Sequence, residues 1–195
     1  INAGSERIAR SLGNTLVAPA ITYVPEGDID PPSGHMRFAG TISIPQEVFE
    51  SVLEHTARSL KRHGFTDILF IGDSGPNQRP QESIAKKLSQ EWSKEGINVF
   101  HISDWYKIGV FDDYLISQGA TYEQIGNHAG LRDTSLLLAI APNHVRTSNI
   151  SPGQGADVDG VSGDPTIASA EYGRIGFDLI FNAALNQIKE LMELE

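Results

Sequence analysis

The alternation of short apolar runs with amphipathic segments is the feature that most constrains how this chain can fold. Residues 68–71, Ile-Leu-Phe-Ile, form a continuous apolar run that is typical of a central parallel strand covered on both faces. A helical stretch follows in which Ile84, Leu88 and Trp92 share one stripe, and a second strand-like segment covers residues 97–102. This β-α-β order predicts an α/β chain with a mainly parallel sheet.

The flanking segments extend the pattern. Apolar residues at helical spacing predict further helices at residues 5–12, 45–63, 136–141 and 175–194, and the third of these is apolar all round, which indicates a buried helix. Residues 15–21 are predicted to form another buried strand. Glycine and proline make long loops of residues 23–40 and 148–165. We therefore expect residues 1–195 to form one domain, a three-layer α/β/α sandwich.

Composition excludes several classes of function. The net charge of −10 would repel a phosphate backbone, so nucleic acid is not expected as a partner. No window approaches 18 uninterrupted apolar residues, so we expect a soluble protein that does not cross a membrane. The chain has no cysteine, which rules out thiolate metal sites and a cysteine nucleophile. Localisation stays open between the cytoplasm and export, and Ile1 at the first position favours export with removal of a signal peptide.

Polar residues follow both central strands, where open α/β sheets bind ligands. The first strand is followed by a turn that carries Asp73, Ser74 and Asn77, and the second is followed closely by Trp105 and Tyr106. These residues could form a pocket with an aromatic wall. They could equally form a turn that satisfies its own backbone and a pair of core aromatics.

A third cluster lies at the start of the predicted buried helix, where His128 and Asp133 are five positions apart. Imidazole and carboxylate groups suit a divalent cation or the activation of a water nucleophile. The alternative is a capping cluster in which Asp133 accepts hydrogen bonds from backbone N–H groups.

Several motifs resemble those of the creatininase (creatinine amidohydrolase) family. Residues 128–135, His-Ala-Gly-Leu-Arg-Asp-Thr-Ser, resemble its His-Ala-Gly-x-x-Glu-Thr-Ser motif, and residues 160–165 resemble its Gly-Val-x-Gly-Asp-Pro loop. Residues 35–44 resemble its Phe-Pro-Gly-Thr segment, with Ala39 in place of the proline. The turn at residues 72–78 stands where the family has Asn-Gly-His-Gly-Gly-Asn.

The resemblance implies a set of site residues. His128 falls on the catalytic histidine, and Asp133 replaces a metal-binding glutamate, with Asp73 as a second candidate ligand for zinc or manganese. Ser74 stands at a metal-binding histidine of the family, and a hydroxyl is a poorer ligand than imidazole. The family's other ligands, a Glu-x-His and a later Asp, are expected in an N-terminal segment upstream of Ile1. His35, Ser74, Asn77, Trp105 and Tyr106 are expected to bind substrate.

Two functions follow as hypotheses. The first is a metal-dependent amidohydrolase that cleaves a small cyclic or linear amide and assembles as a homo-oligomer, with a hexamer implied by the family. The second is a non-catalytic family member whose metal site is degraded and which binds a small molecule or acts as a scaffold. A serine-nucleophile enzyme is a third reading, but the residues around Ser74 lack the Gly-x-Ser-x-Gly pattern.

Overall fold

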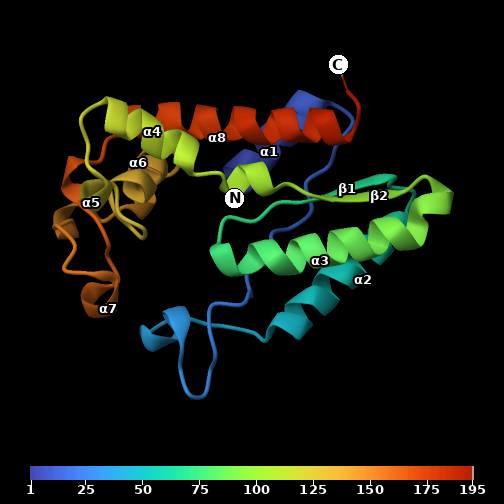
Figure 1. The fold of residues 1–195 in the computed structure, drawn as a ribbon, viewed down its shortest axis with the longest axis horizontal. Coiled ribbons are helices and arrows are strands. Elements are labelled where there is room, and N and C mark those ends of the chain that lie inside the picture. Colours follow the sequence, from blue (N-terminus) through green and yellow to red (C-terminus); the bar gives the residue numbers. More distant parts are fainter. Residues whose placement is uncertain (195) are drawn as a thin grey trace. The chain divides into compact units, whose positions relative to one another are not determined.

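A computed structural model describes residues 1–194, and its elements are shown in Figure 1. Its contacts divide the chain into two compact units, residues 1–106 with 186–195, and residues 107–185. The longer helices and the strands are α1 (Asn2–Leu12), α2 (Gln46–Arg62), β1 (Asp67–Phe70), α3 (Gly75–Trp92), β2 (Asn98–His101), α4 (Gly109–Ser117), α6 (Leu131–Ile140) and α8 (Ala170–Leu191). Short helices include α5 (Tyr122–Ile125) and α7 (Ala156–Asp159).

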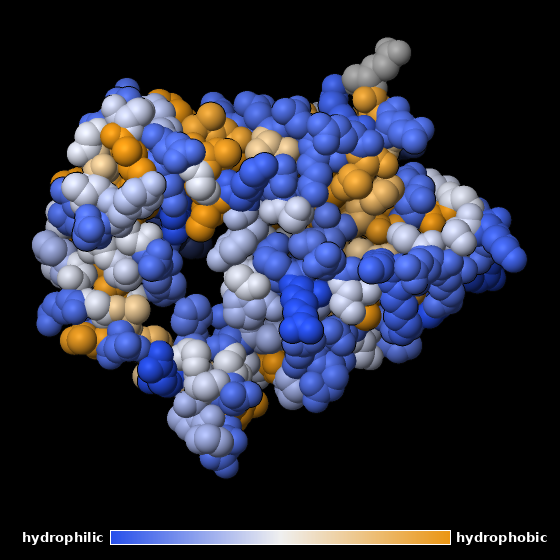
Figure 2. Space-filling model, in the orientation of Figure 1, coloured by the Kyte–Doolittle hydropathy of each residue, from blue (hydrophilic) through white to orange (hydrophobic). Residues whose placement is uncertain are grey.

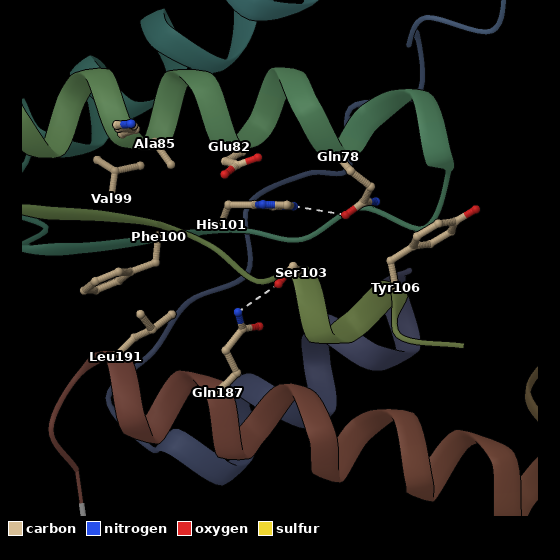
Figure 3. A pocket seen from close by; sticks show the side chains of 11 residues that line it. Gln78, Glu82, Ala85, Val99, Phe100, His101, Ser103, Tyr106, Gln187 and Leu191 are labelled. Atoms are coloured by element: carbon tan, nitrogen blue, oxygen red, sulfur yellow. Dashed lines mark hydrogen bonds between the residues drawn. The ribbon is translucent and has the colours of Figure 1, made fainter. Parts of the chain in front are cut away.

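The first unit is built on the β1-α3-β2 motif that the sequence predicts. The two strands pair in parallel, with Ile68 opposite Val99 and Phe70 opposite His101. In Figure 3, β2 lies between α3 and the C-terminal turns of α8, so helices flank the strand on both sides. The predicted strands and their parallel pairing are therefore confirmed, and the sheet of the described residues has two strands.

The core of this unit joins one face of each helix to the sheet. Phe49 and Leu53 of α2 pack with Leu88 and Trp92 of α3 and with Ile68 of β1. All are less than 5% exposed. The opposite side of α3 is polar, and hydrophilic residues predominate over it in Figure 2. The apolar stripe of α2 and α3 is therefore what fixes both helices to the sheet.

The strand predicted at residues 15–21 is wrong. The structure has no strand there, and Leu16 is 76% exposed. A run of apolar residues becomes a strand only when a neighbouring strand satisfies its backbone N–H and C=O groups. Within residues 1–194, β1 is paired with β2 alone, so this segment has no ladder to join.

The second unit is mainly helical. Helix α6 begins at Leu131, five residues earlier than predicted, and the extended residue Gly130 precedes it as the N-cap. The prediction that its second half is buried is wrong, since Leu137 is 41% exposed and Ile140 is 42% exposed. Helices α8, α2 and α1 are confirmed, with starts or ends that differ by a few residues. None of the helices in residues 1–194 is long and apolar enough to cross a membrane.

A network of charges joins the outer faces of α2 and α3. Arg58 donates hydrogen bonds to Glu54 (2.8 Å) and to both oxygens of Glu91 (each 2.7 Å), and it lies over the Trp92 ring. Lys87 bonds the other oxygen of Glu54. The hydrogen bonds from Arg58 lower the pKa of Glu91 to about 2, from an ordinary value of 4.5.

This network should make stability fall in acid. Because the folded-state pKa of Glu91 lies below its unfolded value, the pair stabilises the fold above about pH 4.5 and is lost as the pH falls toward 2. We expect Glu91→Gln to lower the free energy of unfolding at pH 7 and to change it little near pH 2, as measured by urea denaturation. Glu190→Gln, an exposed carboxylate on α8, is the control; an equal effect of both variants at pH 7 would contradict the prediction.

Candidate active site

In the first unit a partly buried carboxylate joins two of the predicted site residues. The side chain of Glu26, 17% exposed, accepts a hydrogen bond from the Ser74 hydroxyl (3.2 Å) through Oε1 and contacts His35 Nδ1 (2.7 Å) through Oε2. The loop that carries Glu26 and His35 is held closed by Ser43, whose hydroxyl bonds the backbone of residues 26 and 27. Glu26, His35 and Ser74 therefore form one polar cluster beyond the end of β1.

Hydrogen bonds from a side chain of α3 stabilise the turn that follows β1. Ser74 is the residue before α3, and Gln78 Nε2 donates to the backbone oxygens of Gly72 (3.0 Å) and Ser74 (2.9 Å). Asn77 and Gln81 lie one helical turn apart and are 5% and 4% exposed. Among the described residues, Asn77 Oδ1 and Gln81 Oε1 have no hydrogen-bond partner. Asn77 is thus buried next to the turn after β1, and its Oδ1 is an acceptor that makes no hydrogen bond with the described residues.

The other predicted site residues of this unit differ in how exposed they are. Asp73 is 57% exposed at its side chain and pairs with the Ile1 amino group (3.2 Å). Trp105 is buried at 7%, and its ring fills the space beside Gly4 of α1, so the structure favours its core reading over a pocket wall. Tyr106 is half-buried, with its hydroxyl next to Gly75.

In the second unit the two glycine-rich motifs pack directly on each other. The backbone of His128 bridges that of Ser162, with Ser162 N donating to the His128 carbonyl (2.8 Å). Gly126 has a φ of 68°, and a Cβ added there would lie 1.6 Å from the Ser162 carbonyl oxygen. The contact leaves no room for a side chain, which explains why both motifs need glycine at this place.

This packing fixes the orientation of His128. Its Nδ1 lies 2.5 Å from the Gly160 carbonyl oxygen, an acceptor, so Nδ1 carries the proton and Nε2 is the basic nitrogen of the neutral ring. The next residue, Ala129, has a φ of 54°, a left-handed conformation that few residues other than glycine adopt. The exposed imidazole therefore sits on a backbone that the two loops constrain together.

Asp133 and Arg132 hold that backbone in place. Asp133 Oδ2 accepts from Ala129 N (2.8 Å) and Oδ1 accepts from Arg132 Nε (3.3 Å). Arg132 is 4% exposed and bonds both oxygens of Asp112 (2.7 and 2.8 Å). Burial opposes the charge of Arg132, but the Asp112 hydrogen bonds and the two carboxylates keep its pKa above the ordinary value. Asp133 therefore accepts a backbone N–H, as in the alternative that the sequence left open, although this N–H belongs to Ala129 before the N-cap residue Gly130 and not to the first turn of α6.

The described carboxylates and imidazoles do not fit a divalent metal by themselves. Within residues 1–194 no group of three histidines or carboxylates is close enough to hold an ion. A catalytic zinc normally has about three protein ligands. Both oxygens of Asp133 already accept hydrogen bonds. A metal at Asp133 and Asp73 stays a prediction, and no catalytic step is derived through it.

Three functional candidates escaped the sequence reasoning. Glu26 lies in a long loop with no motif of its own, and only the fold brings it to Ser74, 48 residues away. The carbonyl of Gly160 carries no side-chain signal at all, although the Gly-rich segment 160–165 could have pointed to it. Asp112 is separated from Arg132 by 20 residues, and a buried arginine cannot be recognised from sequence.

An exposed histidine that a backbone carbonyl orients on a glycine-rich loop is a candidate general base or acid. Comparison with known proteins identifies the family. A family model described as "Creatininase: Creatinine amidohydrolase" matches residues 2–188. The chain belongs to the creatininase family.

Curated relatives carry a more specific name. A "Mycofactocin precursor peptide peptidase" of Mycobacterium ulcerans is 29% identical over 185 residues, covering 86% of this chain and 63% of the relative. A protein of the same name from Mycolicibacterium smegmatis is 26% identical over 193 residues, covering 90% of this chain and 67% of the relative. The chain thus spans about two thirds of the length of these relatives.

Solved structures show the same fold. A creatinine amidohydrolase (creatininase) matches with a TM-score of 0.76 and 21% identity, over 97% of this chain and 80% of that one. A creatininase described as the manganese form matches with a TM-score of 0.76 and 22% identity over the same shares. A variant creatininase described as the Zn-Zn type has a TM-score of 0.75 and 21% identity, again over 97% and 80%. The predicted α/β fold of creatininase is confirmed.

The packing of the two loops predicts an unequal cost for two glycine substitutions. Gly126→Ala should lower the free energy of unfolding by about 2 kcal/mol or more, because strain at positive φ adds to a clash with the Ser162 carbonyl. Gly119→Ala is the matched control, since Gly119 also has positive φ (94°) but no atom within 4 Å of an added Cβ. It should cost about 1 kcal/mol. Equal losses in denaturant titrations would show that the loops can move apart.

Proposed function

We propose that this chain belongs to a hydrolase that cleaves a carbon–nitrogen amide bond, with His128 transferring the proton. The observation that carries the proposal is the orientation of His128 by the Gly160 carbonyl, on the motif by which the family is recognised. A neutral imidazole whose Nδ1–H is held by a carbonyl presents Nε2 as a base toward water, and later as an acid toward the leaving amine.

The names of the relatives suggest the substrate class. The curated relatives are called peptidases of a precursor peptide, and the solved structures are called creatinine amidohydrolases. Both names describe hydrolysis of a C–N bond next to a carbonyl group. We propose a small amide or the amide bond of a short peptide as the substrate.

A test compares turnover with and without the imidazole. The protein should be incubated with creatinine and with a panel of short peptides, and release of the amine followed by mass spectrometry. We expect His128→Ala to reduce the rate by about 100-fold or more, the usual effect of removing a general base. His55→Ala, on the exposed side of α2, is the matched control and should keep full activity.

Turnover that survives in His128→Ala would contradict this role for the histidine. Absence of turnover for every substrate would favour a second function, a family member that binds a small molecule without cleaving it. That second function is favoured by one observation, the lack of a three-residue ligand cluster among residues 1–194.

The metal content can be predicted separately. Zinc and manganese occur in the descriptions of the solved structures, but both oxygens of Asp133 here accept hydrogen bonds. We expect a preparation of residues 1–195 to hold well below one equivalent of either metal by elemental analysis. Near-stoichiometric metal that is lost in Asp133→Ala, with Asp113→Ala as the control, would mean that Asp133 is a ligand after all.

A homo-oligomer is part of the same proposal, and the hexamer implied by the resemblance is its specific form. Light scattering on the purified protein measures it directly.

A further inference from the structure

A cavity of about 540 Å³ lies along the outer edge of β2. Figure 3 shows its construction: α3 contributes Gln78, Glu82 and Ala85 from one side, and α8 contributes Gln187 and Leu191 from the other. Every lining residue belongs to the first unit. The volume is in the range of small-molecule pockets.

One position of the strand edge in this cavity is already covered. Asn98 and Ile102 donate their backbone N–H groups toward β1, so the alternate residue Val99 points its backbone outward. Its N–H donates to Ser89 Oγ (2.8 Å), and its carbonyl accepts from the same hydroxyl (2.7 Å). Ser89 thus occupies the outward hydrogen-bonding positions of Val99.

One end of the cavity offers hydrogen-bond acceptors. Gln78 Nε2 is used by two backbone carbonyls, so its Oε1 faces His101 Nε2 (3.0 Å) as an acceptor. Nε2 of His101 then carries the proton, and Nδ1 is the acceptor of the ring. Burial lowers the pKa of His101, so the ring is neutral at pH 7 although the nearby Glu82 opposes this effect.

Two opposite charges stand on the same wall. Glu82 and Lys86 are four residues apart on α3, on the side that lines the cavity, whereas Lys87 and Glu91 turn toward α2 and pair there with Glu54 and Arg58. The pocket therefore presents one carboxylate and one ammonium group with no net charge. A molecule with one charge of each sign complements it better than an ion.

The remaining wall is apolar. Phe100 and Leu191 line the cavity on the side of β2 that faces α8, across the strand from Glu82 of α3. Gln187 fixes this wall to the sheet, because its amide bonds Ser103 Oγ (3.0 Å) and the backbone N–H of Asp104 (2.9 Å). A hydrocarbon group of a few carbons can be buried on this surface.

We propose that this cavity binds a small apolar amino acid as a zwitterion, with its ammonium group at Glu82 and His101, its carboxylate at Lys86 and its side chain on Phe100 and Leu191. The site lies apart from His128 in sequence, and its ligand is not the amide that is cleaved. It is the kind of site through which a free amino acid could be sensed by the protein.

L-Leucine is the probe for the test, with 4-methylpentanoate and 3-methylbutylamine as analogues that lack the ammonium and the carboxylate group. Calorimetry should give a dissociation constant on the order of 1 mM for leucine, and binding about tenfold weaker or worse for either analogue. Amide chemical shifts should change at residues 78, 101 and 100. His128→Ala should bind leucine unchanged, which separates this site from the proposed hydrolysis.

Matched variants on one helix locate the charges. Glu82→Gln and Lys86→Gln should each weaken leucine binding about threefold to tenfold, as expected for exposed ion pairs. Glu91→Gln and Lys87→Gln, on the side of α3 that faces α2, should leave it unchanged. The proposal is overturned if leucine causes no shifts at these residues up to 10 mM as an upper limit for such a weak site, if an analogue binds as well as leucine, or if both pairs of variants behave alike.

Discussion

The buried guanidinium of Arg132 is the interaction on which the second unit depends. It is 4% exposed and is neutralised by Asp112 of α4 and by Asp133 of its own helix. Removing one partner of such a buried pair costs about 3–5 kcal/mol, because an uncompensated charge stays behind. The same pair sets the position of Asp133, and Asp133 in turn holds the backbone at Ala129. The orientation of His128 therefore depends on the buried charge of Arg132, through Asp133 and the backbone of Ala129.

The glycines of the two loops act together with this ion pair. Arg132 and Asp133 fix the start of α6, whereas Gly126 lets the segment before it touch the backbone of Ser162. Without that contact the Gly160 carbonyl would not reach His128. A buried electrostatic contact and a steric requirement for glycine thus converge on one imidazole. This convergence makes a chemical role for His128 more persuasive than the motif alone.

The first unit depends on a different force. Trp92, Leu88 and Phe49 are almost completely buried, and hydrophobic burial fixes α2 and α3 against the sheet. The polar groups at the end of β1 are arranged on this scaffold, with Gln78 bonding the backbone on both sides of the turn. Asn77 and Gln81 are buried, and their side-chain oxygens have no hydrogen-bond partner among the described residues. This part of the unit therefore holds two buried acceptors that make no hydrogen bond. Such acceptors are usual near functional sites.

The sequence by itself determined the local elements and their order. Apolar periodicity predicted α2 and α3, the run at residues 68–71 predicted β1, and four motifs in order, including the one around His128, indicated the family. It misplaced the strand at residues 15–21, because pairing needs a neighbouring strand that apolar periodicity does not report. It also left the roles of Asp133 and Trp105 open. Only the tertiary structure decided that Trp105 fills the core and that Glu26 meets Ser74, since these outcomes depend on contacts between residues distant in sequence.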